Sequence, residues 1–270
     1  MKNEKISKFF RNKVVLLTGA SSGIGRALSY ELAQYHPRLV LLARNINKLE
    51  EIACEISATT EVHCRKCDVR DPEDIKNAVA DTVEKWQRID LAILCAGADV
   101  LNSIDRYSTE IYRTLISTNY LQAVDFLENL LEVYRIQGEG RIVAISSLAD
   151  GRGMPFGGAY AASKAALLRF LESVRFELGL SGIGVTIIRP GFVDTPMTKQ
   201  NNFKMPFVIT PEHAAKKISS AICRGKKEMS FPFFSSLGLS ILKMLPIPIL
   251  DYIHSRYYKK VMQGMSRQAP

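Results

Sequence analysis

The sequence lacks several features that would place it in a particular class of protein. Its first 13 residues contain no apolar run of the kind that a secretory signal carries, so we expect no signal peptide. Its five cysteines are odd in number, which disfavours a disulfide framework and favours a reducing, intracellular setting. No internal repeat or low-complexity linker indicates a second domain among the 270 residues.

The distribution of charge gives no sign of a nucleic-acid partner. The net charge is +9, but the basic residues form no stripe interleaved with aromatic side chains, so we expect no nucleic-acid partner. Attraction to phosphates, on a cofactor or on a membrane surface, fits this excess better.

Cys64 and Cys67 beside His63 have no second ligand pair at a useful spacing. We interpret them as small core residues and expect no metal.

One stretch carries residues suited to acid–base chemistry. Tyr160 and Lys164 stand four apart in a segment of helical pattern, so both side chains leave one face. Most such pairs are surface pairs of small effect. A neighbouring ammonium, however, favours phenolate and would lower the pKa of Tyr160 from about 10 toward working pH. Ser147, thirteen residues before Tyr160, ends an apolar run and offers a hydroxyl to a substrate oxygen. These groups predict proton transfer to or from an alcohol or a carbonyl.

A glycine-rich turn near the N-terminus is an independent signal. An apolar run at 14–17 is followed by T-G-A-S-S-G-I-G at 18–25 and then by a helical pattern. A strand, a turn and a helix N-terminus in this order present free N–H groups to a phosphate. We expect Gly19 to allow the tight turn, Gly23 to let a pyrophosphate approach and Gly25 to let the helix pack closely.

Together the motifs T-G-x-x-x-G-x-G, S and Y-x-x-x-K resemble the short-chain dehydrogenase/reductase (SDR) family, from about Val14 to about Phe231. The resemblance implies that Asn119 holds a water in a proton relay through Lys164; a buried structural asparagine is the alternative. The chain departs from the family at Leu94 and Cys95, which replace both asparagines of N-N-A-G. We expect this departure to alter stability rather than chemistry.

The end of the second apolar run bears on the choice of cofactor. Residues 39–43 lead into Arg44 and Asn45, and no carboxylate stands there. An acid at this place would accept from a ribose 2′-hydroxyl, whereas an arginine suits a 2′-phosphate. We therefore expect NADP(H) rather than NAD(H), with a solvated arginine as the alternative. With the contacts that the resemblance implies, the expected cofactor residues are Gly19, Ser21, Ser22, Gly23, Ile24, Gly25, Arg44, Asn45, Asp68, Val69, Ala96, Gly97, Tyr160, Lys164, Pro190, Gly191, Val193 and Thr195.

Six apolar runs alternating with helical patterns predict an α/β fold, a single doubly wound parallel sheet of Rossmann type flanked by helices. The resemblance adds a seventh strand, and a long helical pattern covers 104–135. We divide the chain into a basic N-terminal segment (1–12), a dinucleotide-binding catalytic domain (13–232) and a hydrophobic C-terminal extension (233–270).

The extension is almost wholly apolar over 229–253, but Lys243, three prolines and Asp251 interrupt it, so we expect no membrane-spanning helix. Its tyrosines and basic residues suit a segment lying on an anionic membrane. Covering the substrate pocket and forming a subunit interface are equally open. The apolar side chains expected to wall the substrate site are Met197, Phe203, Met205 and Phe207.

We predict an NADP(H)-dependent oxidoreductase that interconverts a carbonyl and a secondary alcohol on an apolar, lipid-like substrate. Its expected catalytic residues are Ser147, Tyr160, Lys164 and Asn119. We expect a cytoplasmic protein, in solution or peripheral at a membrane, and a homodimer or homotetramer. A catalytically idle NADP(H)-binding protein and a membrane-associated interaction protein are the rival hypotheses. An epimerase or dehydratase is disfavoured because those relatives resemble T-G-x-x-G-x-x-G.

Overall fold

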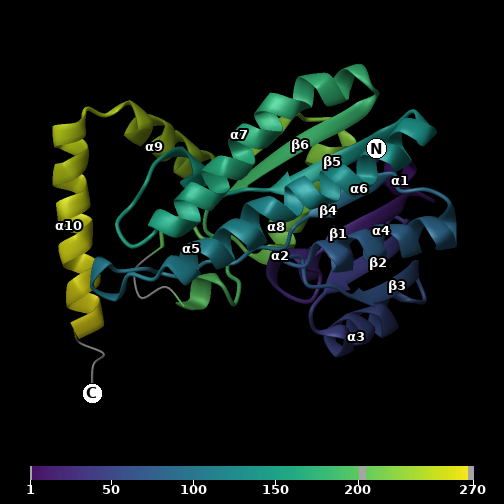
Figure 1. The fold of residues 1–270 in the computed structure, drawn as a ribbon, viewed down its shortest axis with the longest axis horizontal. Coiled ribbons are helices and arrows are strands. Elements are labelled where there is room, and N and C mark those ends of the chain that lie inside the picture. Colours follow the sequence, from purple (N-terminus) through teal and green to yellow (C-terminus); the bar gives the residue numbers. More distant parts are fainter. Residues whose placement is uncertain (1, 201–204, 267–270) are drawn as a thin grey trace.

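Seven parallel strands form one sheet in the order β3-β2-β1-β4-β5-β6-β7 within the part of the chain that the structure describes (Figure 1). The structure is a computed structural model that describes residues 2–200 and 205–266. The strands are β1 (Val14–Thr18), β2 (Arg38–Ala43), β3 (Glu61–Lys66), β4 (Leu91–Leu94), β5 (Gly140–Ile145), β6 (Ile183–Pro190) and β7 (Glu228–Phe231). The predicted doubly wound sheet is confirmed, including the seventh strand. Its strand order reverses between β1 and β4, where folds of this kind bind their ligands.

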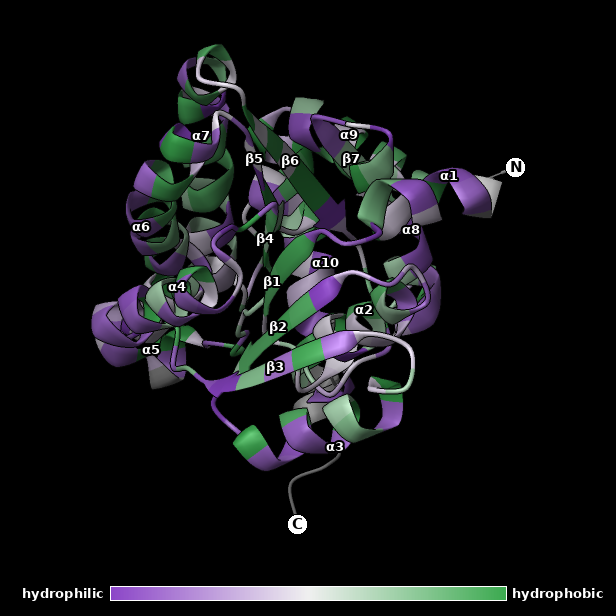
Figure 2. Cartoon of the chain, turned by 90° about the vertical axis from the view of Figure 1, so that its right-hand side faces the viewer, coloured by the Kyte–Doolittle hydropathy of each residue, from purple (hydrophilic) through white to green (hydrophobic). Residues whose placement is uncertain are grey.

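Helices cover both faces of the sheet. They are α1 (Lys2–Phe10), α2 (Gly23–Ala33), α3 (Ile46–Ile56), α4 (Pro72–Trp86), α5 (Thr109–Ile116), α6 (Gln122–Gln137), α7 (Gly158–Leu180), α8 (Pro211–Cys223), α9 (Phe233–Met244) and α10 (Ile247–Ser266). One layer contains α2, α3 and α8, with α1 packed on α8, and the other contains α4 to α7. Figure 2 shows mostly apolar strands between these layers. The central strands β1, β2 and β4 are apolar because a parallel sheet is buried on both faces, whereas the edge strand β3 carries polar residues.

The N-terminal segment is tied into the core rather than frayed. Phe10 is fully buried and stacks on Tyr35 with ring centroids 5.9 Å apart. Ile6, one turn earlier on α1, belongs to the same buried cluster. Burying a phenylalanine side chain contributes about 1.5–3 kcal/mol, so this helix stabilises the domain that it precedes.

The continuous helical pattern predicted for 104–135 is interrupted in the structure. A short 3-10 turn, η1 (Ile104–Arg106), precedes α5, which begins at Thr109. A π-helical turn, η2 (Ser117–Leu121), then separates α5 from α6 and contains Asn119. Such turns insert one residue into a helix and often lie at functional sites. Apolar periodicity alone does not reveal them, because the helix axis continues through the turn.

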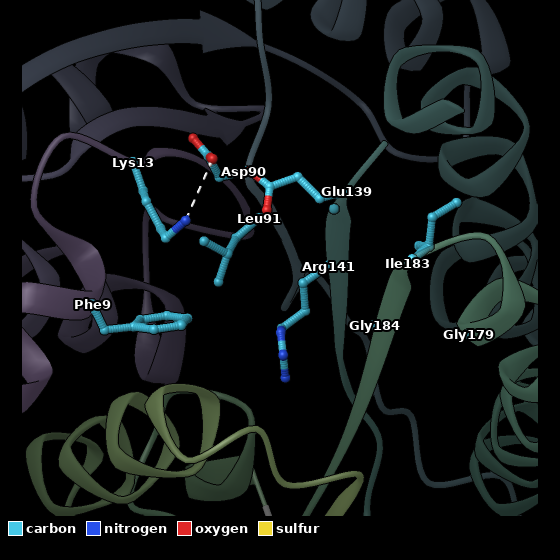
Figure 3. A pocket seen from close by; sticks show the side chains of 11 residues that line it. Phe9, Lys13, Asp90, Leu91, Glu139, Arg141, Gly179, Ile183 and Gly184 are labelled. Atoms are coloured by element: carbon cyan, nitrogen blue, oxygen red, sulfur yellow. Dashed lines mark ion pairs between the residues drawn. The ribbon is translucent and has the colours of Figure 1, made fainter. Parts of the chain in front are cut away.

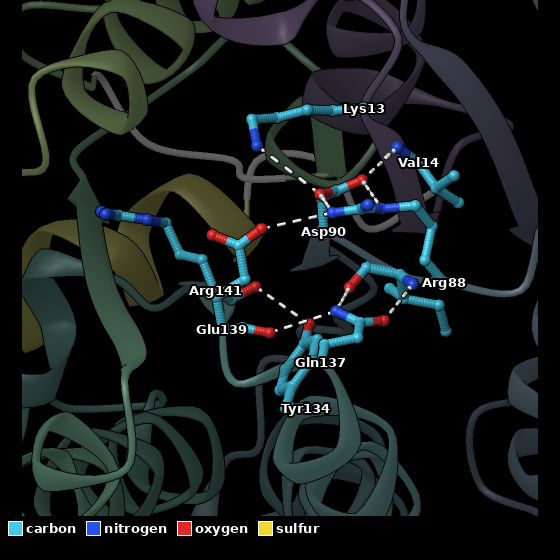
Figure 4. A network of polar contacts seen from close by, with 9 residues as sticks. Lys13, Val14, Arg88, Asp90, Tyr134, Gln137, Glu139 and Arg141 are labelled. Carbon is cyan, nitrogen blue, oxygen red and sulfur yellow. Dashed lines mark hydrogen bonds and ion pairs between the residues drawn. The ribbon is translucent and has the colours of Figure 1, made fainter.

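At the amino ends of the strands, a buried carboxylate links several elements. Asp90 accepts hydrogen bonds from the Val14 backbone N–H (2.8 Å) and from Arg88 Nη2 (2.6 Å). Lys13 adds an ion pair at 3.5 Å, beside a pocket into which Arg141 extends (Figure 3). Gln137 and Tyr134 continue the network with backbone contacts to Ile89 and Arg141 (Figure 4). This network fixes β1, β4 and β5 at the edge opposite the glycine turn.

The C-terminal extension forms two helices that join at Leu245 and Pro246. Helix α9 packs against the turn η3 (Leu148–Gly151), where the Lys243 side chain covers Gly151. Helix α10 stands at the end of the molecule opposite α1 (Figure 1). Among the described residues, no helix is long and apolar enough to cross a membrane.

Candidate active site

The glycine turn after β1 has the geometry of a phosphate-binding loop. Gly19 has a φ of +67°, and a Cβ there would lie 2.8 Å from Ala96 Cα. A Cβ on Gly25 would overlap the carbonyl oxygen of Gly19, so the first turn of α2 can lie against the loop only with glycine there. The Ser22 side chain makes no capping hydrogen bond to α2. The N–H groups at the helix N-terminus therefore remain for an anion.

Two adjoining clefts run along the carboxyl ends of the strands. We call the first the inner cleft; it is lined by the glycine turn, the ends of β5 and β6, and residues 190–198. The second, the outer cleft, is lined by the glycine turn, the end of β2 and the end of β3. Every cofactor residue predicted from the sequence lines one of them. Gly19, Ser22, Ala96 and Gly97 line both.

The outer cleft is rich in cations. Arg44, Lys66 and Arg70 line it, whereas Asp68 is its one acidic lining residue among those described. Arg70 pairs with Asp68 at 2.6 Å, and this hydrogen bond holds the pKa of that carboxyl below its usual value. The predicted Asn45 has a structural task as well, because its side chain caps α3 by accepting from Lys48 N at 3.2 Å. The contribution of Lys66 and Arg70 was missed in the sequence, although both flank Asp68.

The turn after β4 is held despite the missing asparagines. Thr18 Oγ1, at the end of β1, accepts hydrogen bonds from the backbone N–H groups of Cys95 and Ala96, both at 2.9 Å. Gln122 Nε2 donates to Ala96 O at 2.8 Å. The sequence analysis did not identify this bracing, because Thr18 lies 77 residues from Cys95.

Tyr160 and Ser147 face each other across the inner cleft. Tyr160 lies in the first turn of α7, and Ser147 is the second residue after β5. Burial raises the pKa of Tyr160, and a hydrogen bond from the Ser147 hydroxyl lowers it in part. The neighbouring Ser146 turns away, since its hydroxyl donates to Asp150 Oδ2 at 3.0 Å. Both serines line the inner cleft, and the choice of Ser147 that the spacing predicted stays a prediction.

Lys164 is almost fully buried one turn along α7 from Tyr160. Its Nζ donates to the Ile145 carbonyl at 2.8 Å and lies 5.9 Å from the centre of the Tyr160 ring. Burial lowers the pKa of Lys164 to about 8. The sequence predicted that this ammonium lowers the pKa of Tyr160. In the structure, burial is the first influence on the pKa of Tyr160 and raises it, and the charged groups that act on this pKa, Asp99 and Asp150, raise it as well.

Asn119 lies behind the clefts and joins three elements. Its Oδ1 accepts from Ala98 N, and its Nδ2 donates to Ala98 O and to Ser163 Oγ, each at 2.9 Å. A Cβ at Gly97 would come within 3.2 Å of Asn119 Oδ1 and 3.5 Å of Lys164 Nζ. Asn119 therefore fixes the turn after β4 against α7, the structural role left open in the sequence analysis. The relay water stays a prediction.

The apolar walls expected for the substrate site are only partly in place. Met197 lines the inner cleft. Phe207 is 56% exposed and stacks on Phe234 of α9 with centroids 5.8 Å apart, so it faces the extension and solvent. Phe203 lies outside the described residues, and Met205 is partly buried without lining the cleft.

Comparison with known proteins agrees with this geometry. The family described as short chain dehydrogenase matches residues 13–205. The chain belongs to the short-chain dehydrogenase family. An uncharacterized oxidoreductase of Myxococcus xanthus is 34% identical over 240 residues, covering 88% of this chain and 95% of that protein. The 11-beta-hydroxysteroid dehydrogenase 1A of Arabidopsis thaliana is 35% identical over 242 residues, which cover 82% of this chain and 68% of that protein.

Solved structures show the same fold. An alcohol dehydrogenase from the archaeon Thermococcus sibiricus, complexed with 5-hydroxy-NADP, superposes with a TM-score of 0.74 at 25% identity and covers 81% of this chain and 95% of its own. Levodione reductase gives a TM-score of 0.77 at 23% identity, and the superposition covers 84% of this chain and 99% of that chain. This short-chain dehydrogenase is accordingly an oxidoreductase of a family that acts on alcohol and carbonyl groups with NAD(P)(H).

Proposed function

We propose that this short-chain dehydrogenase is an NADP(H)-dependent oxidoreductase that interconverts a carbonyl and a secondary alcohol. The observation that carries the proposal is the convergence of Ser147, Tyr160 and Lys164 on the inner cleft, next to the glycine turn. A general acid, a polarising hydroxyl and a phosphate-binding loop at one cleft suit carbonyl reduction beside a bound dinucleotide.

The chain's own residues fit NADP(H). The uncapped N-terminus of α2 suits the pyrophosphate, and the cations of the outer cleft suit a 2′-phosphate. Arg44 and Lys66 have no ion-pair partner among the described residues, whereas Arg70 is already engaged by Asp68. When bound, the nicotinamide supplies or accepts the hydride. The complex of the archaeal neighbour with an NADP derivative supports this choice without deciding it.

Tyr160 would exchange the proton with the substrate oxygen. Because burial raises its pKa, the phenol is protonated at neutral pH, which suits donation to a nascent alkoxide in the reducing direction. Ser147 would hydrogen-bond the same oxygen. Lys164, fixed by the Ile145 carbonyl, would keep a positive charge beside the reacting group. These roles for the catalytic residues stay predictions.

An apolar substrate, a peripheral membrane contact and the oligomeric state also stay predictions. The outer surface of the extension bears exposed apolar side chains such as Phe233 (71% exposed) and Met244 (85% exposed). These side chains are available to a membrane or to a second copy of the chain, and the same exposure removes them from the walls of the inner cleft.

A cofactor titration followed by turnover assays tests the proposal. We expect NADPH to bind at least about tenfold more tightly than NADH, equivalent to about 1.4 kcal/mol. Reduction of aldehydes and ketones should then be measurable by NADPH consumption. Tyr160→Phe should bind NADPH normally but lose about a hundredfold to ten-thousandfold in kcat.

Tyr252→Phe, which removes a hydroxyl from a 61% exposed tyrosine on α10, is the matched control and should keep full activity. NADPH binding without turnover of any carbonyl would favour the idle binding protein. Absence of binding by either nucleotide would refute the proposal and favour the interaction protein.

A further inference from the structure

The inner face of α10 covers the loops that surround the catalytic residues. Leu250 and Val261 are buried, and His254 and Tyr257 lie between them at helical spacing on the same side. Tyr258 stacks on Phe156, in the loop before α7, with centroids 5.0 Å apart and planes within 9°. Thus α10 presents histidine and tyrosine side chains, rather than only apolar ones, to the protein beneath it.

The loop after β4 runs below this helix and is joined to the loop before α7. Asn102 N donates to the Phe156 carbonyl at 2.9 Å, directly behind the ring on which Tyr258 stacks. At its start the same loop is fixed by the hydrogen bonds between Ala98 and Asn119. Asp99 and Asn102 therefore lie on a loop that is fixed at Ala98 and at Asn102.

Four buried polar atoms without partners belong to the loop after β4 and to the inner face of α10. Asp99 Oδ1, both side-chain polar atoms of Asn102 and His254 Nε2 are shielded from solvent and have no hydrogen-bond partner among the described residues. They are four of the eight such atoms found in residues 2–200 and 205–266. Buried donors and acceptors are nearly always paired, so a concentration of unpaired ones beside a catalytic cleft indicates a polar ligand.

Asp99 also lies within electrostatic reach of the catalytic groups. Its carboxylate raises the pKa of Tyr160 and that of Tyr257 on α10. Burial raises the pKa of Asp99 itself, and Lys164 lowers it in part. The carboxylate thus lies within electrostatic reach of both the proton donor of the proposed reaction and Tyr257 on the covering helix.

We propose that the substrate carries a hydrogen-bond donor, a hydroxyl or an ammonium group, beside its carbonyl, and that Asp99 and Asn102 bind this group beneath α10. This inference rests on the proposed reductase function. A carboxylate accepts from either donor, and the amide of Asn102 can both donate and accept. A plain hydrocarbon at this place would leave these polar atoms unpaired, so the site discriminates against it.

Matched ketones test the proposal on the intact protein. Hydroxyacetone, aminoacetone and butanone differ only in the group beside the carbonyl, and their kcat/KM values with NADPH can be compared directly. We expect the hydroxy or the amino ketone to exceed butanone by about tenfold or more, as for a hydrogen bond to a charged group. The two polar ketones distinguish a hydroxyl from an ammonium as the preferred donor. The inference would be overturned if the kcat/KM values of hydroxyacetone and of aminoacetone were both within about threefold of the value for butanone.

Asp99→Asn and Asn102→Leu should reduce the ratio of kcat/KM for the polar ketone to kcat/KM for butanone toward unity, mainly through a higher KM for the polar ketone. Any effect of Asp99 on the pKa of Tyr160 acts on all three ketones and cancels in the ratio. Asp105→Asn makes the same change at an exposed position of the same loop and should leave the ratio unchanged. An unchanged ratio in Asp99→Asn would contradict the assignment. If either variant fails to bind NADPH and so has not folded, the wild-type ratio and the other variant decide.

The inference and the proposed function can fail separately. If NADPH binds but no ketone is reduced, the proposed function fails, and thermal shifts of the NADP⁺ complex with hydroxyacetone and aminoacetone then test the donor site. A shift caused by a polar ketone but not by butanone, and lost in Asp99→Asn, would support the site. Equal shifts, or none, would overturn it.

Discussion

Replacing Arg44 with alanine should weaken NADPH binding and leave NADH binding almost unchanged. Three cations line the outer cleft. Arg70 is paired with Asp68 at 2.6 Å, whereas Arg44 and Lys66 have no ion-pair partner among the described residues. A 2′-phosphate is the group of NADPH that NADH lacks. The difference between the two nucleotides therefore isolates this interaction.

The size of the effect follows from the exposure of the site. Two unit charges 4 Å apart interact by about 1 kcal/mol in water and by about 4 kcal/mol at an effective dielectric constant near 20. Arg44 is exposed and salt screens it, so we take the lower part of this range, about 1.4–2.3 kcal/mol. This corresponds to about a tenfold to fiftyfold higher Kd for NADPH.

Fluorescence titration of both nucleotides, at low and at high salt, measures the effect. Arg169→Ala, which removes the same charge from a side chain 75% exposed on α7, is the control and should change neither Kd. Ala43→Asp places an acid at the end of β2 and should favour NADH. Equal losses for NADPH and NADH in Arg44→Ala, or no loss at all, would refute the assignment of a 2′-phosphate to this cleft.

Four further predictions concern stability and pH. Asp90→Ala leaves the buried Val14 N–H unpaired and should lower the free energy of unfolding, measured by denaturant titration, by about 2–3 kcal/mol. Glu73→Ala, which breaks an exposed ion pair, is the control and should change that free energy by less than about 1 kcal/mol. Thr18→Val removes the acceptor for two backbone N–H groups and should cost about 1–3 kcal/mol, while Thr18→Ser should retain most of that stability; equal losses would contradict the bracing. Because burial lowers the pKa of Lys164 to about 8, its ammonium is lost as pH rises through that value, and kcat/KM for reduction should fall above about pH 8. The same shift makes the folded state bind fewer protons than the unfolded state between about pH 8 and 10, so the contribution of Lys164 to stability should rise with pH there, and Lys164→Met should abolish that rise.

Much of the fold could be predicted because the signals are local. Strands buried on both faces read as short apolar runs, so β1, β2 and β4 were apparent from the sequence. The π-helical turn at Asn119 was not, since helical apolar patterns lie on both sides of it and the shift that one inserted residue makes between them was not recognised. The role of Thr18 was missed for another reason: its partners at Cys95 and Ala96 become neighbours only when β1 and β4 pair.

The sequence by itself determined the order of the strands along the chain and of the helices that connect them, the glycine turn and the placement of Tyr160 and Lys164 on one helical face, because each depends on the spacing of nearby residues. Only the tertiary structure decided what surrounds those residues. It buried Tyr160 so that desolvation raises its pKa, and it left apolar side chains of the extension such as Met244 exposed. It also brought Tyr257 of α10 within electrostatic reach of Asp99. Burial and long-range contacts depend on which distant segments meet, and a one-dimensional pattern does not specify that meeting.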